Sequence, residues 1–109
     1  MITWDDFEKI DIRAGTIIEV QDFLNAKKAA YRLTIDFGKL GIKKSSAQIT
    51  SLYSKYELKG KQVVAVVNFP PKQIANFFSE CLVLGVYDED KNVVLLQIDK
   101  NVKNGSKVG

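Results

Sequence analysis

The feature that most constrains the fold is a double proline placed between two apolar segments. The apolar segment Val63–Val67 is followed almost at once by Pro70 and Pro71. Because proline lacks a backbone N–H and cannot continue a central strand, the pair must end the first segment. The chain becomes apolar again at Cys81–Val86. A loop at the mouth of a small sheet is therefore predicted between them. Seven of its side chains are candidates for ligand contact: Asn68, Phe69, Lys72, Phe77, Phe78, Ser79 and Glu80.

Several of these candidates also have a structural explanation. Phe77 and Phe78 are adjacent, so on an extended chain they point in opposite directions and only one is expected to be buried. Ser79 and Glu80 can hydrogen-bond the backbone N–H groups of a turn. Asn68 can hold the loop in place. The sequence leaves open which of these side chains touch a ligand.

Most of the chain shows the patterns of short strands. Residues 30–37 alternate cleanly between apolar and polar side chains, which predicts a half-buried antiparallel strand. Further strands are predicted at 14–20, 42–50, 62–68, 81–87 and 93–98. Thr3 and Asp6 give a helix-start pattern, so one or two helical turns are expected over residues 3–9. Residues 51–58 are expected to form a short helix or a helical turn.

These elements predict one all-β domain spanning residues 1–109. A five-stranded oligonucleotide-binding (OB) barrel with a short N-terminal helix and small additions fits the length and the number of strands. Such barrels expose the face of their second and third strands, here residues 30–37 and 42–50. That face would carry further candidates for ligand contact: Arg32, Lys43 or Lys44, Ser46 and Gln48.

Charge is distributed unevenly along the chain. Residues 27–72 hold ten basic and two acidic side chains, a net charge of +8, whereas the whole chain carries only +3. Such a segment attracts anionic partners, although an ordinary lysine-rich surface gives the same pattern. Lys43 and Lys44 are the stronger candidates, because a pair of charges on a strand that faces a groove has no evident packing role.

Composition argues against catalysis. The chain has no histidine, so it lacks an imidazole base and histidine metal ligands. Its single cysteine, Cys81, can form neither an internal disulfide nor a thiolate zinc site, and it fits a reducing compartment. We predict a binding protein, with no enzymatic activity, metal or cofactor. No apolar segment is long enough to span a bilayer and the N-terminus lacks a secretory pattern, so we expect a cytoplasmic protein without membrane insertion.

Several segments, taken together, resemble a known family. Residues 11–17 (DIRAGTI), 30–38 (AYRLTIDFG) and 68–85 are similar in order and spacing to the EMAP-II-like tRNA-binding domain. Residues 45–50 (SSAQIT), 68–75 (NFPPKQIA) and 104–109 (NGSKVG) resemble the CsaA branch of that family. The resemblance covers essentially the whole chain.

The resemblance implies a homodimeric OB-fold protein of the cytoplasm. It implies a molecular chaperone that binds non-native or export-bound precursor polypeptides in the secretion pathway, with SecA as a further partner. Relatives in the family bind tRNA by its shape and backbone charge, which makes tRNA the alternative ligand. Trp4, Phe7 and Phe69 are predicted to supply the apolar seam of the dimer, because a small domain gains core by pairing.

The sequence departs from tRNA-binding relatives in the loop after the prolines. Ala75 carries no charge where many of them are basic, and Cys81 replaces a glycine. Thr50 lies where some of them have arginine. Fewer phosphate contacts weaken tRNA binding, and added aromatic area favours apolar polypeptide segments. The balance favours the chaperone.

Overall fold

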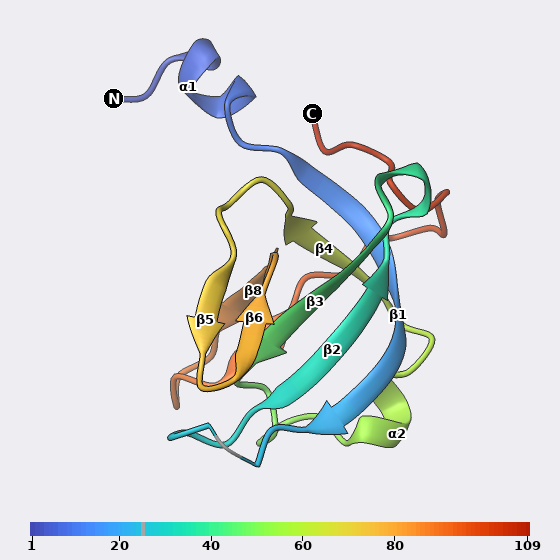
Figure 1. Cartoon of the computed structure of the whole chain (residues 1–109). Coiled ribbons are helices and arrows are strands. Elements are labelled where there is room, and N and C mark those ends of the chain that lie inside the picture. Colours follow the sequence, from blue (N-terminus) through green and yellow to red (C-terminus); the bar gives the residue numbers. More distant parts are fainter. Residues whose placement is uncertain (25) are drawn as a thin grey trace.

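The computed structural model, which describes residues 1–24 and 26–109, is a small β barrel (Figure 1). Five strands in the order β3-β2-β1-β4-β7 curl into a nearly closed barrel, and each strand is antiparallel to its neighbours. The strands of this sheet are β1 (Ile12–Asp22), β2 (Tyr31–Asp36), β3 (Ile42–Ala47), β4 (Gln62–Val66) and β7 (Leu82–Val83). The predicted OB-type barrel is confirmed.

Two small hairpins and three short helices complete the fold. The hairpins are β5 (Lys72–Ile74) with β6 (Phe77–Ser79), and β8 (Gly85–Tyr87) with β9 (Val93–Leu95). The helices are α1 (Trp4–Glu8), the 3-10 turn η1 (Gly38–Leu40) and α2 (Lys55–Leu58). Figure 1 shows α1 projecting from one end of the barrel, far from α2 at the other. No helix among the described residues is both long and apolar enough to cross a bilayer.

The alternation predicted in residues 30–37 is confirmed. Along β2 the inward side chains Tyr31, Leu33 and Ile35 are buried, and the residues between them are only partly covered. They join the main core with side chains from β1, β4, α2 and the residue after β2, among them Ile17, Val63, Leu58 and Phe37. Pairing between β1 and β2 shifts by one residue at Ile18, an irregularity of the bulge type that increases the local twist of a strand.

The predicted N-terminal helix is also confirmed. Thr3 caps α1: its hydroxyl accepts from the Asp6 N–H at 3.1 Å, and the Asp6 carboxylate accepts from the Thr3 N–H at 3.0 Å. None of the helical residues is buried. Capping therefore sets the local shape of α1, while packing against the barrel contributes little.

The structure differs from the prediction in several strands, and the predicted strands 62–68 and 93–98 end at Val66 and Leu95. The segment after the prolines, predicted as a loop, contains the β5–β6 hairpin. The third strand ends at Ala47, earlier than expected. The predicted strand 81–87 is divided between two sheets, as β7 and β8. A Cβ on Gly85 would lie 2.6 Å from the Val94 carbonyl oxygen, so glycine at this position permits the close crossing with β9.

The C-terminal residues return to the first strand. The Ala14 N–H donates to the Ser106 carbonyl at 2.9 Å, and the Val108 N–H donates to the Ile12 carbonyl at 2.9 Å. Arg13 and Lys107 thus face each other in an isolated antiparallel bridge. The start of β1, which β2 does not reach, is covered in this way by the end of the chain.

A strained turn joins β5 and β6. Ala75 has φ of 54°, a left-handed conformation that favours glycine, and its side chain is exposed. Replacing Ala75 by Gly is expected to raise the free energy of unfolding by about 1 kcal/mol, because relief of strain outweighs the added freedom of the unfolded chain. Urea unfolding followed by circular dichroism measures the change.

A matched control is Ala29→Gly in the loop before β2, where Ala29 is exposed and φ is not positive. That change is expected to destabilise the protein slightly, since it only adds freedom to the unfolded chain. Equal destabilisation by both substitutions would show that the turn is not strained.

Candidate functional site

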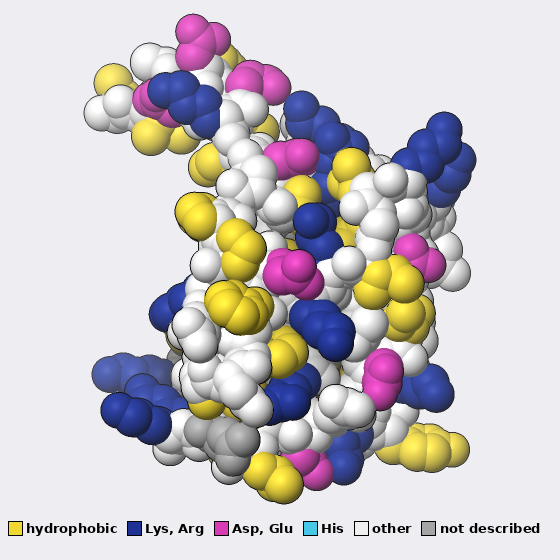
Figure 2. All heavy atoms as spheres, in the orientation of Figure 1, with side chains coloured by type: hydrophobic (Ala, Val, Ile, Leu, Met, Phe, Trp, Pro, Cys, Tyr) yellow, Lys and Arg dark blue, Asp and Glu magenta, His cyan; other side chains and the backbone are white. Residues whose placement is uncertain are grey.

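The outer face of β2 and β3 carries part of the predicted site. Residues paired across neighbouring strands project to the same side of a sheet. Arg32 pairs with Ser46, and Thr34 pairs with Lys44, so these side chains share the outer face. Gln48 follows the last residue of β3 and is exposed. Figure 2 shows Lys and Arg side chains over β2 and β3 with acidic side chains among them.

The two lysines of the predicted pair point in opposite directions. Lys43 pairs with the fully buried Ile35, which places it on the barrel side of β3, and it is half-buried. Lys44 lies on the outer face and is exposed. The structure therefore assigns the outer position to Lys44 and separates Lys43 from the other candidates on this face.

Arg32 is held between two aromatic rings. Its guanidinium carbon lies 4.5 Å from the ring centre of Phe23 and 5.1 Å from that of Phe77. The two rings meet edge to face, with centres 5.3 Å apart. One terminal nitrogen donates to the Asn76 side-chain oxygen at 3.3 Å. These cation–π contacts fix the arginine on the outer face.

Phe77 is therefore a supporting residue, and the expectation that only one of the two phenylalanines is buried is confirmed. Phe77 forms a second small core with Phe23 and Ala30, outside the barrel. Phe78 is 54% exposed. The sequence analysis did not identify Phe23 or Asn76 as neighbours of Arg32. Asn76 reaches Arg32 through the β5–β6 hairpin, and the signal for that hairpin was the pair of residues between Ile74 and Phe77 that forms its turn.

Ser79 and Glu80 close the barrel at the free edge of β3. The Glu80 N–H donates to the Lys44 carbonyl at 2.7 Å, and the Glu80 carboxylate accepts from the Lys44 N–H at 2.9 Å. The Ser79 hydroxyl accepts from the Ser46 N–H at 3.1 Å. Their side chains hydrogen-bond backbone N–H groups, as the structural alternative predicted. These N–H groups belong to the neighbouring strand β3, however, and not to the turn that contains Ser79 and Glu80.

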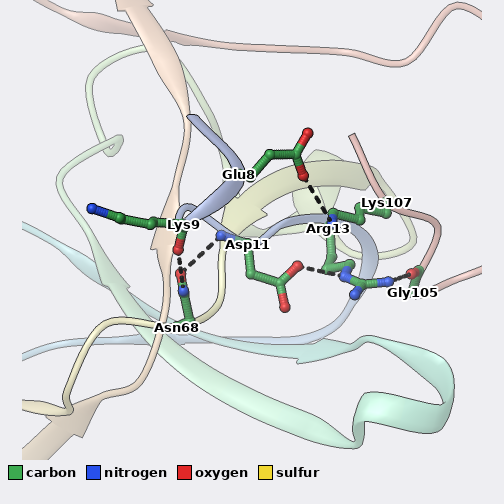
Figure 3. Close-up of polar contacts among 7 residues, drawn as sticks. All are labelled: Glu8, Lys9, Asp11, Arg13, Asn68, Gly105 and Lys107. Atoms are coloured by element: carbon green, nitrogen blue, oxygen red, sulfur yellow. Dashed lines mark hydrogen bonds and ion pairs between the residues drawn. The ribbon is translucent and has the colours of Figure 1, made fainter. Parts of the chain in front are cut away.

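Asn68 secures the chain that leads from α1 into β1 (Figure 3). Its side-chain oxygen accepts from the Asp11 N–H at 3.0 Å, and its nitrogen donates to the Lys9 carbonyl at 2.7 Å. Arg13 bridges the Asp11 carboxylate at 2.6 Å and the Gly105 carbonyl at 3.0 Å. Each polar group of Asn68 thus has a backbone partner, and Arg13 has the structural pairing with Asp11 that the sequence suggested.

Phe69 and Phe78 are the remaining apolar candidates, and together with Pro70 and Pro71 we call them the proline–phenylalanine patch. All four are exposed, and Phe69 is 54% exposed, as is Phe78. Lys72, also exposed, follows the prolines at the start of β5. Figure 2 shows hydrophobic side chains gathered over the loop between β4 and β5 and over β6.

A concave surface lies away from the predicted site. A cavity of about 810 Å³ is lined by Val20, Ser54, Lys55, Tyr56 and Lys59, from β1 and the α2 region, and none of the predicted site residues lines it. Among the described residues, no three side chains of the types that bind metal ions come together. The chemistry of the site is that of apolar and basic side chains on an open surface.

Cys81 lies below the site, between Glu80 and β7. The Ser45 hydroxyl donates to the Cys81 carbonyl at 2.9 Å, and both residues are buried. Burial raises the pKa of the Cys81 thiol from 9.0 to about 11, although the Ser45 hydrogen bond and the charge of Lys43 oppose this shift. The thiol is therefore a neutral core group at ordinary pH.

Comparisons with known proteins agree with this geometry. The sequence model of the family described as "Putative tRNA binding domain" matches residues 12–107. The structure matches that of the CsaA chaperone protein from Picrophilus torridus with a TM-score of 0.94 and 57% identity, covering 100% of both chains. For the chaperone CsaA from Bacillus anthracis the TM-score is 0.95 with 50% identity, covering 100% of this chain and 99% of the other.

Longer relatives contain a similar segment. The methionine–tRNA ligase of Pyrococcus horikoshii is 39% identical over 107 residues, which is 98% of this chain and 14% of the ligase. That of Methanocaldococcus jannaschii is 36% identical over 101 residues, which is 93% of this chain and 15% of the ligase. The chain thus spans about one seventh of the length of these curated relatives.

The raised pKa makes a prediction for Cys81. At pH 8 the folded protein should react with iodoacetamide about a hundredfold more slowly than the urea-unfolded chain, since only the thiolate reacts. Mass spectrometry of timed samples measures both rates. Because the folded pKa exceeds the unfolded value, the Cys81 thiol stabilises the fold below about pH 9, and this stabilisation is lost as the pH rises through 11. Equal rates in the two states would contradict burial of the thiol.

Proposed function

The chain belongs to the tRNA-binding domain family, and from that premise we propose that it is a CsaA-like chaperone that holds non-native polypeptides. The clients we propose are export-bound precursors in the secretion pathway, with SecA as the motor that receives them. The observation that carries the proposal is the proline–phenylalanine patch beside a basic face. High identity over the full length to two proteins named as CsaA chaperones supports it.

The patch has the properties of a surface for apolar segments. Its two phenylalanines are each about half exposed, so a partner's apolar side chains can pack against them. Covering a phenylalanine side chain stabilises a complex by about 1.5–3 kcal/mol, and the contact needs no fixed sequence in the partner. Pro70 and Pro71, which lie between the two phenylalanines in the chain, restrict the backbone of the loop, so little conformational freedom is lost on binding.

Basic side chains next to the patch extend the contact. Lys44 lies on the outer face of β3 and Lys72 at the start of β5, and both are exposed. Long lysine side chains present apolar stems together with a charged end, so they can cover a polypeptide backbone and attract acidic residues. Apolar and basic groups together suit a client that is unfolded and chemically mixed.

We further propose that two copies of the chain pair through α1. The helix projects from the barrel, and Trp4 is 86% exposed and Ile2 76% exposed, whereas Phe7, also assigned to the seam from the sequence, is partly buried. A five-residue helix is marginal by itself, so an apolar partner surface would stabilise it. Phe69, which belongs to the loop that Asn68 ties to the base of α1, would join the seam. The two-fold pair would present two patches to one client, which raises affinity.

Binding of tRNA is the second candidate function, and the outer face of β2 and β3 favours it. Arg32, Lys44 and Ser46 share that face, where they suit a phosphate backbone, and Arg32 is fixed in place by its aromatic neighbours. The family description and the methionine–tRNA ligase relatives are consistent with this candidate. Its affinity would depend steeply on salt, whereas that of an apolar contact would not.

The two candidates predict opposite orders of effect for two substitutions. For polypeptide binding, Phe78→Ala is expected to weaken affinity about tenfold or more, because the burial of one phenylalanine side chain is lost. Lys44→Glu is expected to weaken polypeptide affinity less. For tRNA the order reverses, because Lys44→Glu replaces a phosphate contact by repulsion. Fluorescence anisotropy with a labelled unfolded peptide and with labelled tRNA measures both.

Each substitution has a matched control. Lys43→Glu makes the same charge change on the opposite side of β3, and Tyr87→Ala removes an exposed aromatic side chain outside the patch. The chaperone proposal fails if peptide affinity is the same in Phe78→Ala and Tyr87→Ala. The tRNA candidate fails if Lys44→Glu and Lys43→Glu bind tRNA equally well.

Pairing through α1 is tested by Trp4→Ala. The wild-type chain is expected to give a dimer mass by light scattering at micromolar concentration, and the variant a monomer mass, because the largest apolar side chain of the seam is removed. Tyr56→Ala, which removes an exposed side chain from α2 at the far end of the barrel, is expected to leave the dimer intact. A wild-type monomer would contradict the proposal.

A further inference from the structure

A small basic cavity lies at the end of the barrel remote from Arg32. Figure 1 shows η1 and the C-terminal segment side by side beyond β1. Between them is a cavity of about 360 Å³, lined in part by Phe37 and Leu40, which lie just after the end of β2. Arg32 lies near the start of β2, and neither the outer-face candidates nor the residues of the proline–phenylalanine patch line this cavity.

Four positive side chains line this cavity. Arg13 comes from β1, Lys39 from η1, and Lys103 and Lys107 from the C-terminal segment. No aspartate or glutamate lines it in the part of the chain that the structure describes. Folding therefore brings together like charges from three distant segments, and this convergence opposes folding unless an anion is near.

Two of the four charges have partners of opposite sign. Arg13 is bound to Asp11 at 2.6 Å, and Lys107 lies 3.8 Å from the Glu8 carboxylate (Figure 3). Lys39 and Lys103 form no ion pair with any of the described residues. The cavity thus retains two positive charges that a ligand can neutralise.

The walls of the cavity are fixed by close backbone packing. Gly38 and Gly105 both have positive φ, 66° and 92°. A Cβ on Gly38 would collide with the Asn104 carbonyl oxygen, and one on Gly105 would lie 2.6 Å from the Phe37 carbonyl oxygen. The Asn104 side-chain oxygen accepts from the Thr16 hydroxyl at 2.7 Å. Both glycines are needed to bring η1 against the C-terminal segment, so the cavity exists before a ligand arrives.

We propose that this cavity binds a phosphate group, in a phosphate monoester or in pyrophosphate. A phosphate group carries about two negative charges and three acceptor oxygens, which match the two unneutralised lysines. A carboxylate brings one charge and two oxygens and would leave one lysine without a partner. The volume leaves room for the group that carries the phosphate. This inference holds whichever macromolecule occupies the outer face.

The test uses pyrophosphate with the whole chain. Titration calorimetry at low ionic strength is expected to show saturable binding with one site per chain, and NMR is expected to show that the amide signals of Gly38 and Gly105 shift. The double variant K39Q/K103Q should bind about tenfold or more weakly. In the absence of ligand this variant should melt at the same temperature as wild type or higher, because like charges have been removed, and its melting curve shows that it folds.

The control variant K27Q/K28Q removes two exposed lysines from the loop before β2, at the other end of the barrel. It should bind pyrophosphate like wild type. Equal weakening in the two double variants, unmoved signals of Gly38 and Gly105, or no saturable binding would each overturn the proposal. Succinate that binds as tightly as pyrophosphate would also overturn it, since the cavity would then accept any dianion.

Two oligonucleotides identify the source of the phosphate. They share one sequence, and only one of them carries a 5′-phosphate. If the cavity takes the end of a nucleic acid, the phosphorylated form should bind at least about tenfold more tightly, and K39Q/K103Q should abolish that difference. If both forms bind alike while pyrophosphate binds in the cavity, the source is a small phosphate compound. Either result supports the phosphate site.

Discussion

The structure depends on how the barrel is closed at the free edge of β3. A sheet edge exposes unpaired N–H and C=O groups, and here the last strand of the order, β7, has only two residues. The missing ladder is replaced by Ser79, Glu80 and Cys81, which bond the backbone of Lys44 and Ser46 and the hydroxyl of Ser45. Without these bonds the core side chains on β3 would face water.

The same contact organises the outer surface. Ser79 ends β6, so holding it on β3 also holds the β5–β6 hairpin against the barrel. The hairpin then places Phe77 over Arg32 and leaves Phe78 exposed. Residues of the motif that suggested ligand contact therefore act mainly by positioning others. The groups left for a ligand are the side chains that this scaffold holds outward, chiefly Lys44 and the proline–phenylalanine patch.

The sequence predicted those parts whose pattern is local. Residues 30–37 alternate because one face of β2 is buried, and the cap of α1 needs only Thr3 and Asp6. The β5–β6 hairpin was missed because its strands are three residues long and its turn uses Ala75 where glycine is usual. The setting of Arg32 was missed because Phe23 and Phe77 are far apart in the chain. Lys43 and Lys44 must point to opposite sides of any strand, but which of them faces outward depends on strand register, which sequence does not fix.

The return of the C-terminal residues to β1 bears on how the protein is made. The bond from Arg13 to the Gly105 carbonyl spans 92 positions, and the neighbouring backbone pairs are as distant. During synthesis the start of β1 leaves the ribosome before the residues that pair with it. This edge of β1 can be covered only after nearly the whole domain has been synthesised. Until then the nascent chain presents an open strand, so timing of translation and early protection of that edge are as relevant to its yield as the stability of the finished barrel.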